Sequence, residues 1–286
     1  MRTRLDCVWC MGRQALDAAR AATSDPRLQQ ACMDEALRLS LGCPLDRTPA
    51  EHSMTAYRVV RELTGVADPY AEEKRRQNEA ALALEDEVER LVDAEPDPLR
   101  AAVLASLAGN IIDLGTGQTF DIAEEVDRFL HVAPAHDDYA EFAQALSRAG
   151  RVLFAGDNAG EIVFDKPLVR RLAPAEVVYA VKGGPIINDA TMDDALAVGM
   201  DRLARIVTTG CDAVGAPLHV VGREFLDELA AADLVISKGQ GNLETLDEAD
   251  ADVFFLLKAK CPCVARRLGV GLGDTVIARK GNLPPD

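Results

Sequence analysis

Aromatic residues are scarce in this chain: they make up 5% of its 286 residues, although 48% of the residues are hydrophobic. The core must therefore consist mainly of aliphatic side chains, which are numerous enough to exclude a largely disordered protein. No apolar run approaches the roughly 20 residues that a bilayer-spanning helix needs. The N-terminus also lacks an apolar stretch followed by a small-residue cleavage site, as a secretory leader has. We therefore expect a soluble, cytoplasmic protein without a membrane partner.

Basic residues are few as well, since 31 Lys and Arg stand against 47 Asp and Glu, for a formal net charge of −16. An acidic surface repels the phosphates of nucleic acids and of anionic lipids. This balance argues against nucleic-acid binding and leaves small molecules as the expected partners. It gives no indication of the oligomeric state.

The seven cysteines are an odd number, which argues against a complete disulfide framework. Two pairs lie close in sequence, Cys7 with Cys10 and Cys261 with Cys263. Each pair could supply half of a zinc or iron–sulfur site, act as a redox pair, or consist of buried reduced thiols. C-P-C is not a usual half of a zinc site, and we expect buried thiols before the other two.

The composition of the chain changes near residue 148. Before it, apolar residues recur every three or four positions, as at Leu84, Val88 and Leu91, which is typical of amphipathic helices. The predicted helices cover residues 10–23, 26–41, 51–64, 69–94, 98–113, 121–130 and 137–147. From Arg151 onward, short β-branched runs alternate with helical stretches. The predicted strands lie within residues 152–156, 177–183, 205–210, 232–239, 253–260 and 275–280.

Buried strands that alternate with helices are typical of a parallel sheet covered on both faces. We therefore predict an α/β fold with a Rossmann-like α/β/α core over residues 149–286. Residues 1–148 are predicted to form a helical N-terminal region, a lid that selects the substrate.

Polar loops follow four successive predicted strands. In open α/β sheets, ligands bind beyond the carboxyl ends of the strands, where loops lead into helices. A turn with a helix cap explains any one of these loops by itself, but their convergence at one sheet edge predicts a binding site. All four combine glycine with carboxylate, carboxamide or ammonium groups: GDNAGE (156–161), KGGPIINDAT (182–191), GCD (210–212) and KGQGN (238–242).

These loops carry the groups that phosphate chemistry requires. Asp157, Asn158 and Asp189 supply hard oxygen ligands, which suit Mg²⁺ or Mn²⁺ better than a thiolate-loving ion. Lys238 adds a positive charge for a phosphate, and the neighbouring glycines let backbone N–H groups approach it. The helix that begins near Gly160 would direct its positive end at the same anion. A divalent ion with a lysine and donor-rich loops is typical of phosphoryl transfer.

Long segments of the sequence resemble the metal-dependent damage-control phosphatase family, formerly a domain of unknown function. The matching segments are collinear and extend over essentially the whole chain: GDNAGEIVFDKPLVRRL (156–172), VKGGPIINDAT (181–191), TTGCDAVGAPL (208–218), ADLVISKGQGNLETL (232–246) and FFLLKAKCPCVA (254–265). The N-terminal CVWC (7–10) and GNIIDLG (109–115) are similar to its mostly prokaryotic branch. The resemblance implies a helical region before a Rossmann-like core. It also implies hydrolysis of small phosphorylated metabolites, often damaged or surplus ones, with cobalt, nickel, manganese or magnesium.

The resemblance further implies roles for individual residues. Asp157, Asn158 and Asp189 would hold the metal, and the two aspartates would also be the catalytic residues. Lys238 of the KG-x-x-N motif would contact the substrate phosphate. The remaining substrate-site residues would be the acidic residue nearest to the Asp-Asn pair and two further members of the KG-x-x-N motif: Glu161, Gly239 and Asn242.

Two more asparagines have candidate roles. Asn188 would orient a ligand or a water from behind the site. Asn110 would form a wall of the pocket or, alternatively, only end a helix. The attacking nucleophile is either a metal-activated water or one of the aspartates. We expect water, because a carboxylate bound to metal is the poorer nucleophile.

Two other functions compete with the phosphatase. One is an S-adenosylmethionine-dependent carboxyl methyltransferase, which usually has an acidic residue at the end of its second strand, where this chain has Lys182 and Gly183. The other is a non-catalytic phosphometabolite-binding protein, but binding alone would not need three oxygen ligands for a metal. The sequence therefore favours the phosphatase.

Overall fold

The computed structural model describes residues 1–42, 44–109 and 119–285. Within these residues, a seven-stranded sheet has the order β1-β7-β6-β5-β2-β3-β4. Its strands are β1 (His136–Asp137), β2 (Arg151–Ala155), β3 (Glu176–Val181), β4 (Arg205–Thr208), β5 (Leu234–Lys238), β6 (Val253–Lys258) and β7 (Thr275–Arg279). This sheet confirms the predicted α/β fold class.

Five neighbouring strands, β4, β3, β2, β5 and β6, are mutually parallel, as predicted. The prediction is wrong for the last strand, because β7 pairs with β6 in the antiparallel direction. A parallel connection needs a crossover helix that returns the chain along the full strand. The short helix α13 (Pro262–Leu268) does not do this, so the chain runs back directly beside β6. The two-residue strand β1, which was not predicted, pairs with β7 at the sheet edge.

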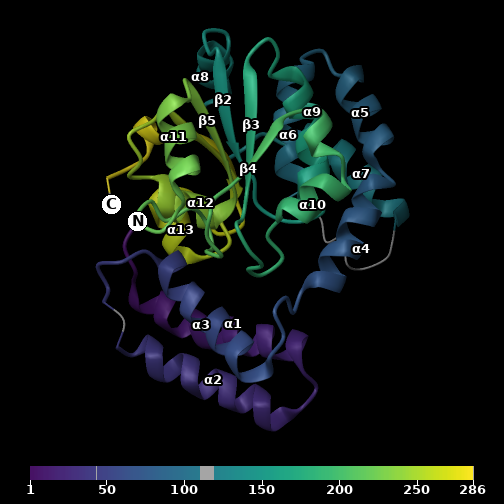
Figure 1. Ribbon diagram of the computed structural model, residues 1–286. Helices are drawn as coiled ribbons and strands as arrows, with labels where there is room; N and C mark the ends of the chain where they lie inside the picture. Colours follow the sequence, from purple (N-terminus) through teal and green to yellow (C-terminus); the bar gives the residue numbers. More distant parts are fainter. Residues whose placement is uncertain (43, 110–118, 286) are drawn as a thin grey trace.

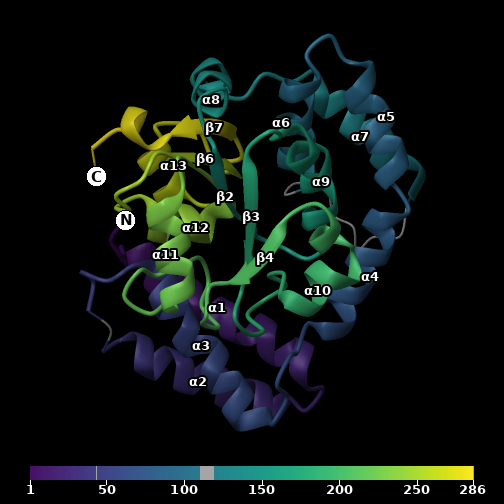
Figure 2. The same ribbon diagram turned by 45° about the horizontal axis from the view of Figure 1, so that its top comes forward.

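Alternating side chains along the strands build two apolar layers, one on each face of the sheet. Phe154 and Tyr179 stack on one face, with their ring centroids 4.9 Å apart. Leu153 and Val178 lie on the other face. The first face is covered chiefly by α6 (Pro98–Gly109) and α9 (Glu161–Arg171), and the second by α11 (Arg223–Ala231), α12 (Gly239–Leu246) and α13 (Figures 1 and 2). The remaining helices of the first layer are α5 (Glu85–Ala94), α7 (Thr119–Leu130), α8 (Tyr139–Leu146) and α10 (Met192–Ala197).

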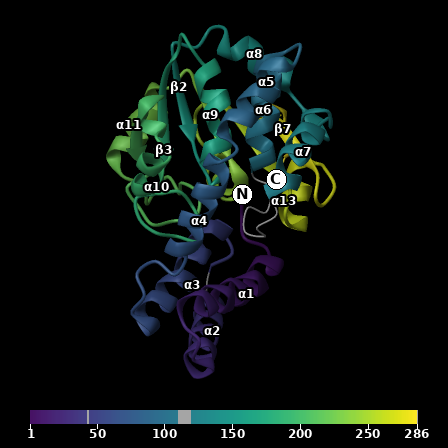
Figure 3. The same cartoon turned by 90° about the vertical axis from the view of Figure 1, so that its right-hand side faces the viewer.

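The first three helices, α1 (Leu5–Ala22), α2 (Pro26–Ser40) and α3 (Pro49–Thr64), form a bundle outside these layers (Figure 3). A capping box between Thr48 and Glu51 begins α3, and Gly65 ends it in the left-handed conformation. The bundle packs on the loops that follow β3 and β4, because Ile186 belongs to its apolar cluster. It therefore lies over the carboxyl ends of the strands.

Three predicted helices need correction. The helix expected over residues 10–23 is α1, which begins earlier, at Leu5. The expected helix 69–94 is divided into α4 (Ala71–Leu82) and α5, with the break at residues 83 and 84. No glycine or proline marks this break, so the sequence pattern could not show it. The expected helix 98–113 is α6 up to Gly109, and its continuation lies outside the described residues.

Helices from the first half of the chain share one apolar cluster with the strands of the second half. Leu107 of α6, for example, is fully buried together with Phe164 of α9 and Phe254 of β6. Residues on both sides of position 148 thus build the core, while the lid role of residues 1–148 stays a prediction. In the described part of the chain, no helix is long and apolar enough to cross a membrane.

This shared core predicts that Leu107→Ala destabilises the whole protein. Removal of a buried leucine side chain leaves a cavity and should lower the free energy of unfolding by about 2–5 kcal/mol. Urea unfolding followed by circular dichroism measures the change. Leu63→Ala, at a position that is 43% exposed in α3, is the control and should change it by less than about 0.5 kcal/mol. Equal effects of the two substitutions would contradict the shared core.

Candidate active site

The polar loops meet where the strand order reverses, between β2 and β5. The chain leaves β2 toward β3 on one side and leaves β5 toward β6 on the other, which opens a crevice at their carboxyl ends. Gly239 follows β5 and touches the loop after β2. Its φ is +76°, and a Cβ atom there would lie 1.9 Å from Oδ2 of Asp157. Only glycine fits this position, which explains the predicted involvement of Gly239.

Backbone pairing brings the three predicted metal ligands together. The N–H of Ala190 donates to the carbonyl of Asp157 at 2.8 Å, and the N–H of Ala159 donates to the carbonyl of Asn188 at 2.8 Å. Asn158 and Asp189 form an isolated antiparallel bridge between these contacts. Loops that are about 30 residues apart in sequence are thereby fixed side by side.

In the metal-free protein, the surroundings of Asp157 and Asp189 disfavour the ionised form of both side chains. Burial raises the pKa of Asp157 to about 8, and repulsion from Glu161 and Asp189 adds to the effect. Burial also raises the pKa of Asp189 to about 6, although the ammonium of Lys182 opposes it. Lys260, which is exposed beyond the end of β6, lowers the pKa of both aspartates and was not among the predicted site residues.

Asn158 lies between two of the carboxylates. Its Nδ2 donates to Oδ2 of Asp157 at 3.0 Å and to Oε2 of Glu161 at 2.9 Å. As a metal ligand, Asn158 would have to present its amide oxygen instead. Oxygen and nitrogen of an amide exchange places by a simple rotation, so the side chain is close to both arrangements.

Lys238 is more deeply buried than its predicted role suggests. Its ammonium is fully enclosed and contacts Oδ1 of Asp165 at 2.6 Å, Oε1 of Glu161 at 2.7 Å and the carbonyl of Ser106 at 2.9 Å. Asp165 also accepts hydrogen bonds from Tyr179 and Ser106, each at 2.6 Å. Burial alone would lower the pKa of Lys238, but the two carboxylates raise it above its usual value. In this arrangement Lys238 fixes Glu161 and does not face the crevice.

A second buried lysine, Lys182, forms hydrogen bonds to residues near these loops. Lys182 is 2% exposed, and its Nζ donates to the carbonyl of Gly215 at 3.0 Å and to Oδ1 of Asn242 at 3.2 Å. It also lies 3.6 Å from Oδ2 of Asp189. Asn242 donates in turn to the carbonyls of Gly156 and Lys238, at 3.0 and 2.8 Å. Asn242, a predicted substrate-binding residue, thus connects the loops after β2 and β5 through hydrogen bonds.

The two remaining predicted site residues are Asn188 and Asn110. Asn188 is partly buried, and its Nδ2 lies 3.4 Å from Oε1 of Gln77 on α4. Asn110, the predicted pocket wall, lies outside the described residues. Sequence patterns missed Asp165, because an aspartate inside an amphipathic helix is usually solvated.

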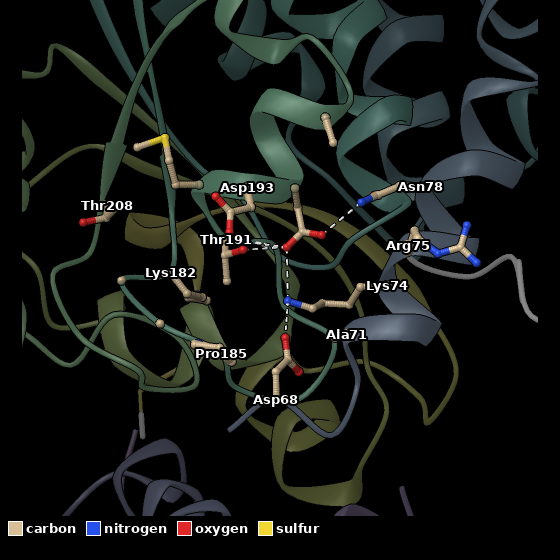
Figure 4. A pocket seen from close by; sticks show the side chains of 15 residues that line it. Asp68, Ala71, Lys74, Arg75, Asn78, Lys182, Pro185, Thr191, Asp193 and Thr208 are labelled. Carbon is tan, nitrogen blue, oxygen red and sulfur yellow. Dashed lines mark hydrogen bonds and ion pairs between the residues drawn. The ribbon is translucent and has the colours of Figure 1, made fainter. Parts of the chain in front are cut away.

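A cavity of about 440 Å³ opens beside these loops, between α4 and the ends of β3 and β4. Figure 4 shows Lys74 and Asn78 of α4 reaching into it from one side, opposite Thr191 and Lys182. Nine of its 15 lining residues are polar or charged, and none of the described lining residues is aromatic. The space next to the crevice therefore offers polar contacts beside apolar ones to a small molecule.

The donor set fits a hard divalent ion. Among the described residues, no three His, Cys, Asp or Glu side chains could hold a metal by themselves. A metal site here would need amide or backbone oxygens in addition to carboxylates, which agrees with the predicted inclusion of Asn158. Oδ2 of Asp189 is buried without a hydrogen bond, and its nearest cation is 3.6 Å away. A divalent cation would relieve this unfavourable burial of negative charge.

The paired cysteines also come together. Cys7 on α1 lies close to Cys263 on α13, and burial raises the pKa of Cys7 to about 12. All six cysteines that the structure describes are free thiols. Within the two pairs, Cys263 is buried, whereas Cys7, Cys10 and Cys261 are only partly buried, so the expectation of buried thiols holds for one of the four.

The fold and the site together define a class of protein: a doubly wound α/β protein with an acidic oxygen-donor site at its switch point. The chain belongs to the family described as the damage-control phosphatase ARMT1-like domain, which matches residues 3–276. This confirms the resemblance seen in the sequence motifs, while membership in the prokaryotic branch with an N-terminal C-x-x-C stays a prediction.

Individual relatives agree with the family assignment. A damage-control phosphatase from Pyrococcus horikoshii is 36% identical over 285 residues, which cover 98% of each chain. The crystal structure of a DUF89 family protein from the same organism has a TM-score of 0.92 at 36% identity, over 98% of this chain and 99% of that one. A 4'-phosphopantetheine phosphatase from Mus musculus is 32% identical over 165 residues, which cover 51% of this chain and 20% of the mouse protein.

The raised pKa values predict how stability depends on pH. In the metal-free protein, Asp157 and Asp189 hold their protons to a higher pH when folded than when unfolded. The folded state therefore binds more protons from about pH 4 to about pH 8, and its stability falls as pH rises through this window. Asp157→Asn removes most of that dependence, so the metal-free variant should melt at a higher temperature than the wild type at pH 8.

Thermal unfolding in the presence of a chelator, at intervals from about pH 5 to about pH 8, measures this difference. Asp201→Asn, an exposed carboxylate in another loop, is the control and should follow the wild-type curve. If the melting temperatures of the wild type and of Asp157→Asn change with pH in the same way, the pKa of Asp157 is not raised in the folded protein as described.

Proposed function

We propose that this chain is a divalent-metal-dependent phosphatase that hydrolyses small phosphorylated metabolites. The convergence of Asp157, Asp189 and Glu161 at the switch point is the observation that supports this most. Membership in a damage-control phosphatase family supports phosphate-ester hydrolysis as the reaction. The preference of carboxylate and amide oxygens for hard ions supports magnesium or manganese, with cobalt or nickel as alternatives.

In this proposal, Asp157, Asp189 and the amide oxygen of Asn158 hold the ion. The bound ion would neutralise negative charge that builds on the phosphate oxygens during transfer. Lys260 contributes an exposed positive charge beside the aspartates, where a phosphate would enter. Lys238 acts through Glu161, which it holds in place by an ion pair of 2.7 Å. Direct contact of Lys238 with phosphate would require the loss of one of its three oxygen partners.

The adjoining cavity supports a small metabolite as the substrate. Its volume of about 440 Å³ and its polar and charged lining residues fit the alcohol portion of a small phosphate ester. The mouse relative is named for the hydrolysis of 4'-phosphopantetheine, which is a small phosphorylated compound. The bundle of α1, α2 and α3, packed on the loops after β3 and β4, is placed to act as the lid that selects such substrates.

Hydrolysis of p-nitrophenyl phosphate tests this function directly. Metal-stripped protein should be inactive and should regain activity with Mg²⁺, Mn²⁺, Co²⁺ or Ni²⁺ supplied separately. Asp189→Asn keeps the shape of the side chain but removes the charge that binds the ion, and it should lower kcat/KM by at least about 100-fold. Asp201→Asn should retain wild-type activity, because this exposed residue lies in the short 3₁₀ helix before β4, whereas the crevice lies at the carboxyl ends of the strands.

Two results would count against the proposal. Full activity of Asp189→Asn would show that the site is assigned to the wrong residues. No hydrolysis of p-nitrophenyl phosphate or of a panel of phosphorylated metabolites with any ion would favour the non-catalytic binding protein. Binding of inorganic phosphate, measured by calorimetry, would then separate that alternative from a protein without a phosphate site.

A further inference from the structure

Helix α4 buries polar residues where it crosses the loops of the crevice. Its three buried residues are Lys74, Asn78 and Ala81, and two of these are polar. A buried polar side chain is retained only where its hydrogen-bonding groups find partners, because an unpaired buried group destabilises the fold. The partners of Lys74 and Asn78 are Asp68, Gly160 and Asp194, which lie in loops around the candidate active site or in the first turn of α10.

Asn78 joins two of these loops with a single carboxamide. Its Oδ1 accepts from the backbone N–H of Gly160 at 2.7 Å, and its Nδ2 donates to Oδ1 of Asp194 at 3.0 Å. Gly160 stands two residues after Asn158. Asp194 caps the start of α10 through Thr191, which stands two residues after Asp189. One side chain therefore bridges the segments that carry all three proposed metal ligands.

Lys74 contacts the same Asp194 that accepts a hydrogen bond from Asn78. Its Nζ lies 3.2 Å from Oδ2 of Asp194 and 2.9 Å from Oδ2 of Asp68. Figure 4 shows Lys74 and Asn78 converging on the same carboxylate at the wall of the cavity. Gln77, on the same helix, approaches Asn188 at 3.4 Å. The polar face of α4 thus holds both loops from one side.

We propose that Asn78 is a positioning residue for metal binding. Through Gly160 and Asp194, it holds the loop of Asp157 and Asn158 at a fixed distance from the loop of Asp189. The inference rests on the proposed function, because the loops are placed for the ion that this function needs. Asn78 itself touches neither the ion nor the substrate.

This role differs from that of an ordinary buried hydrogen bond. The two loops are already paired through the backbones of Ala159 and Asn188, so the fold does not need Asn78 to bring them together. What the carboxamide adds is a third attachment, which limits movement of one loop against the other. Residues that support metal ligands from behind typically affect metal affinity or activity 10- to 100-fold, roughly.

Asn78→Ala tests the proposal through three measurements. Calorimetric titration of the metal-stripped protein with Mn²⁺ alone should show an affinity about 10- to 100-fold weaker than that of the wild type. Hydrogen–deuterium exchange should become faster in a peptide that covers residues 157–162, because the N–H of Gly160 loses its acceptor. At saturating Mn²⁺, kcat for p-nitrophenyl phosphate should fall while KM changes little. The matched control is Glu79→Ala, the next residue of α4, which makes only an exposed ion pair with Arg75.

A charge-swapped double variant keeps the test valid if Asn78→Ala folds poorly. Asn78→Asp combined with Asp194→Asn exchanges the donor and the acceptor across the same hydrogen bond and conserves the total charge. Gly160 keeps an oxygen acceptor, and position 194 keeps an oxygen for Lys74 and Thr191. This double variant should recover slow exchange and Mn²⁺ affinity, whereas Asn78→Asp alone should lose affinity because two carboxylates then face each other.

The outcomes separate this inference from the proposed function. If Asn78→Ala binds Mn²⁺ as the wild type does and keeps slow exchange at residues 157–162, Asn78 is not a positioning residue. The same holds if the double variant is no better than Asn78→Asp. If the wild type binds Mn²⁺ but hydrolyses no phosphate ester, the proposed function fails, while the exchange and affinity measurements still test the role of Asn78.

Discussion

The burial of negative charge at the switch point is the constraint on which the rest of the site depends. Asp157, Asp189, Glu161 and Asp165 lie at or beneath the ends of β2 and β3, and the ammonium groups buried among them are those of Lys182 and Lys238. With all four carboxylates ionised, these two buried ammonium groups balance only two of the four negative charges, and the attraction of the exposed Lys260 does not prevent the rise in the pKa values of Asp157 and Asp189. Protonation of Asp157 and Asp189 reduces this buried negative charge, and their raised pKa values reflect that tendency. Binding of a divalent cation would reduce it as well.

The scaffold that maintains this arrangement draws on both halves of the chain. Helix α6 packs under α9 and supplies the carbonyl of Ser106 to Lys238. Helix α4 supplies Lys74 and Asn78 to the loops on the other side of the crevice. The helical N-terminal region is therefore part of the site, because its side chains complete the hydrogen bonding of the loops. One fold can host unrelated chemistry, so the function must be argued from these side chains.

Much of this was predictable from local patterns. The β-branched runs marked β2 to β7 because a buried strand needs apolar side chains on both faces. Ligands bind beyond the carboxyl ends of such strands, and this rule alone assigned Asp157, Asn158 and Asp189 to one edge of the sheet. The division between α4 and α5 and the direction of β7 were not predictable in this way. Neither a breaking residue between α4 and α5 nor a pattern within β7 marks them, and the direction of β7 appears only in its pairing with β6.

The sequence by itself determined the fold class, the positions of the strands that carry the loops, and the residue types at the crevice. Each of these follows from periodicity or from a motif within about 20 residues. The tertiary structure alone decided the partners of the long polar side chains. Lys238 meets Asp165, 73 residues away, and Asn78 meets Gly160, 82 residues away. A lysine at a strand end can face a phosphate or a buried carboxylate, and only the packing of distant helices selects between the two.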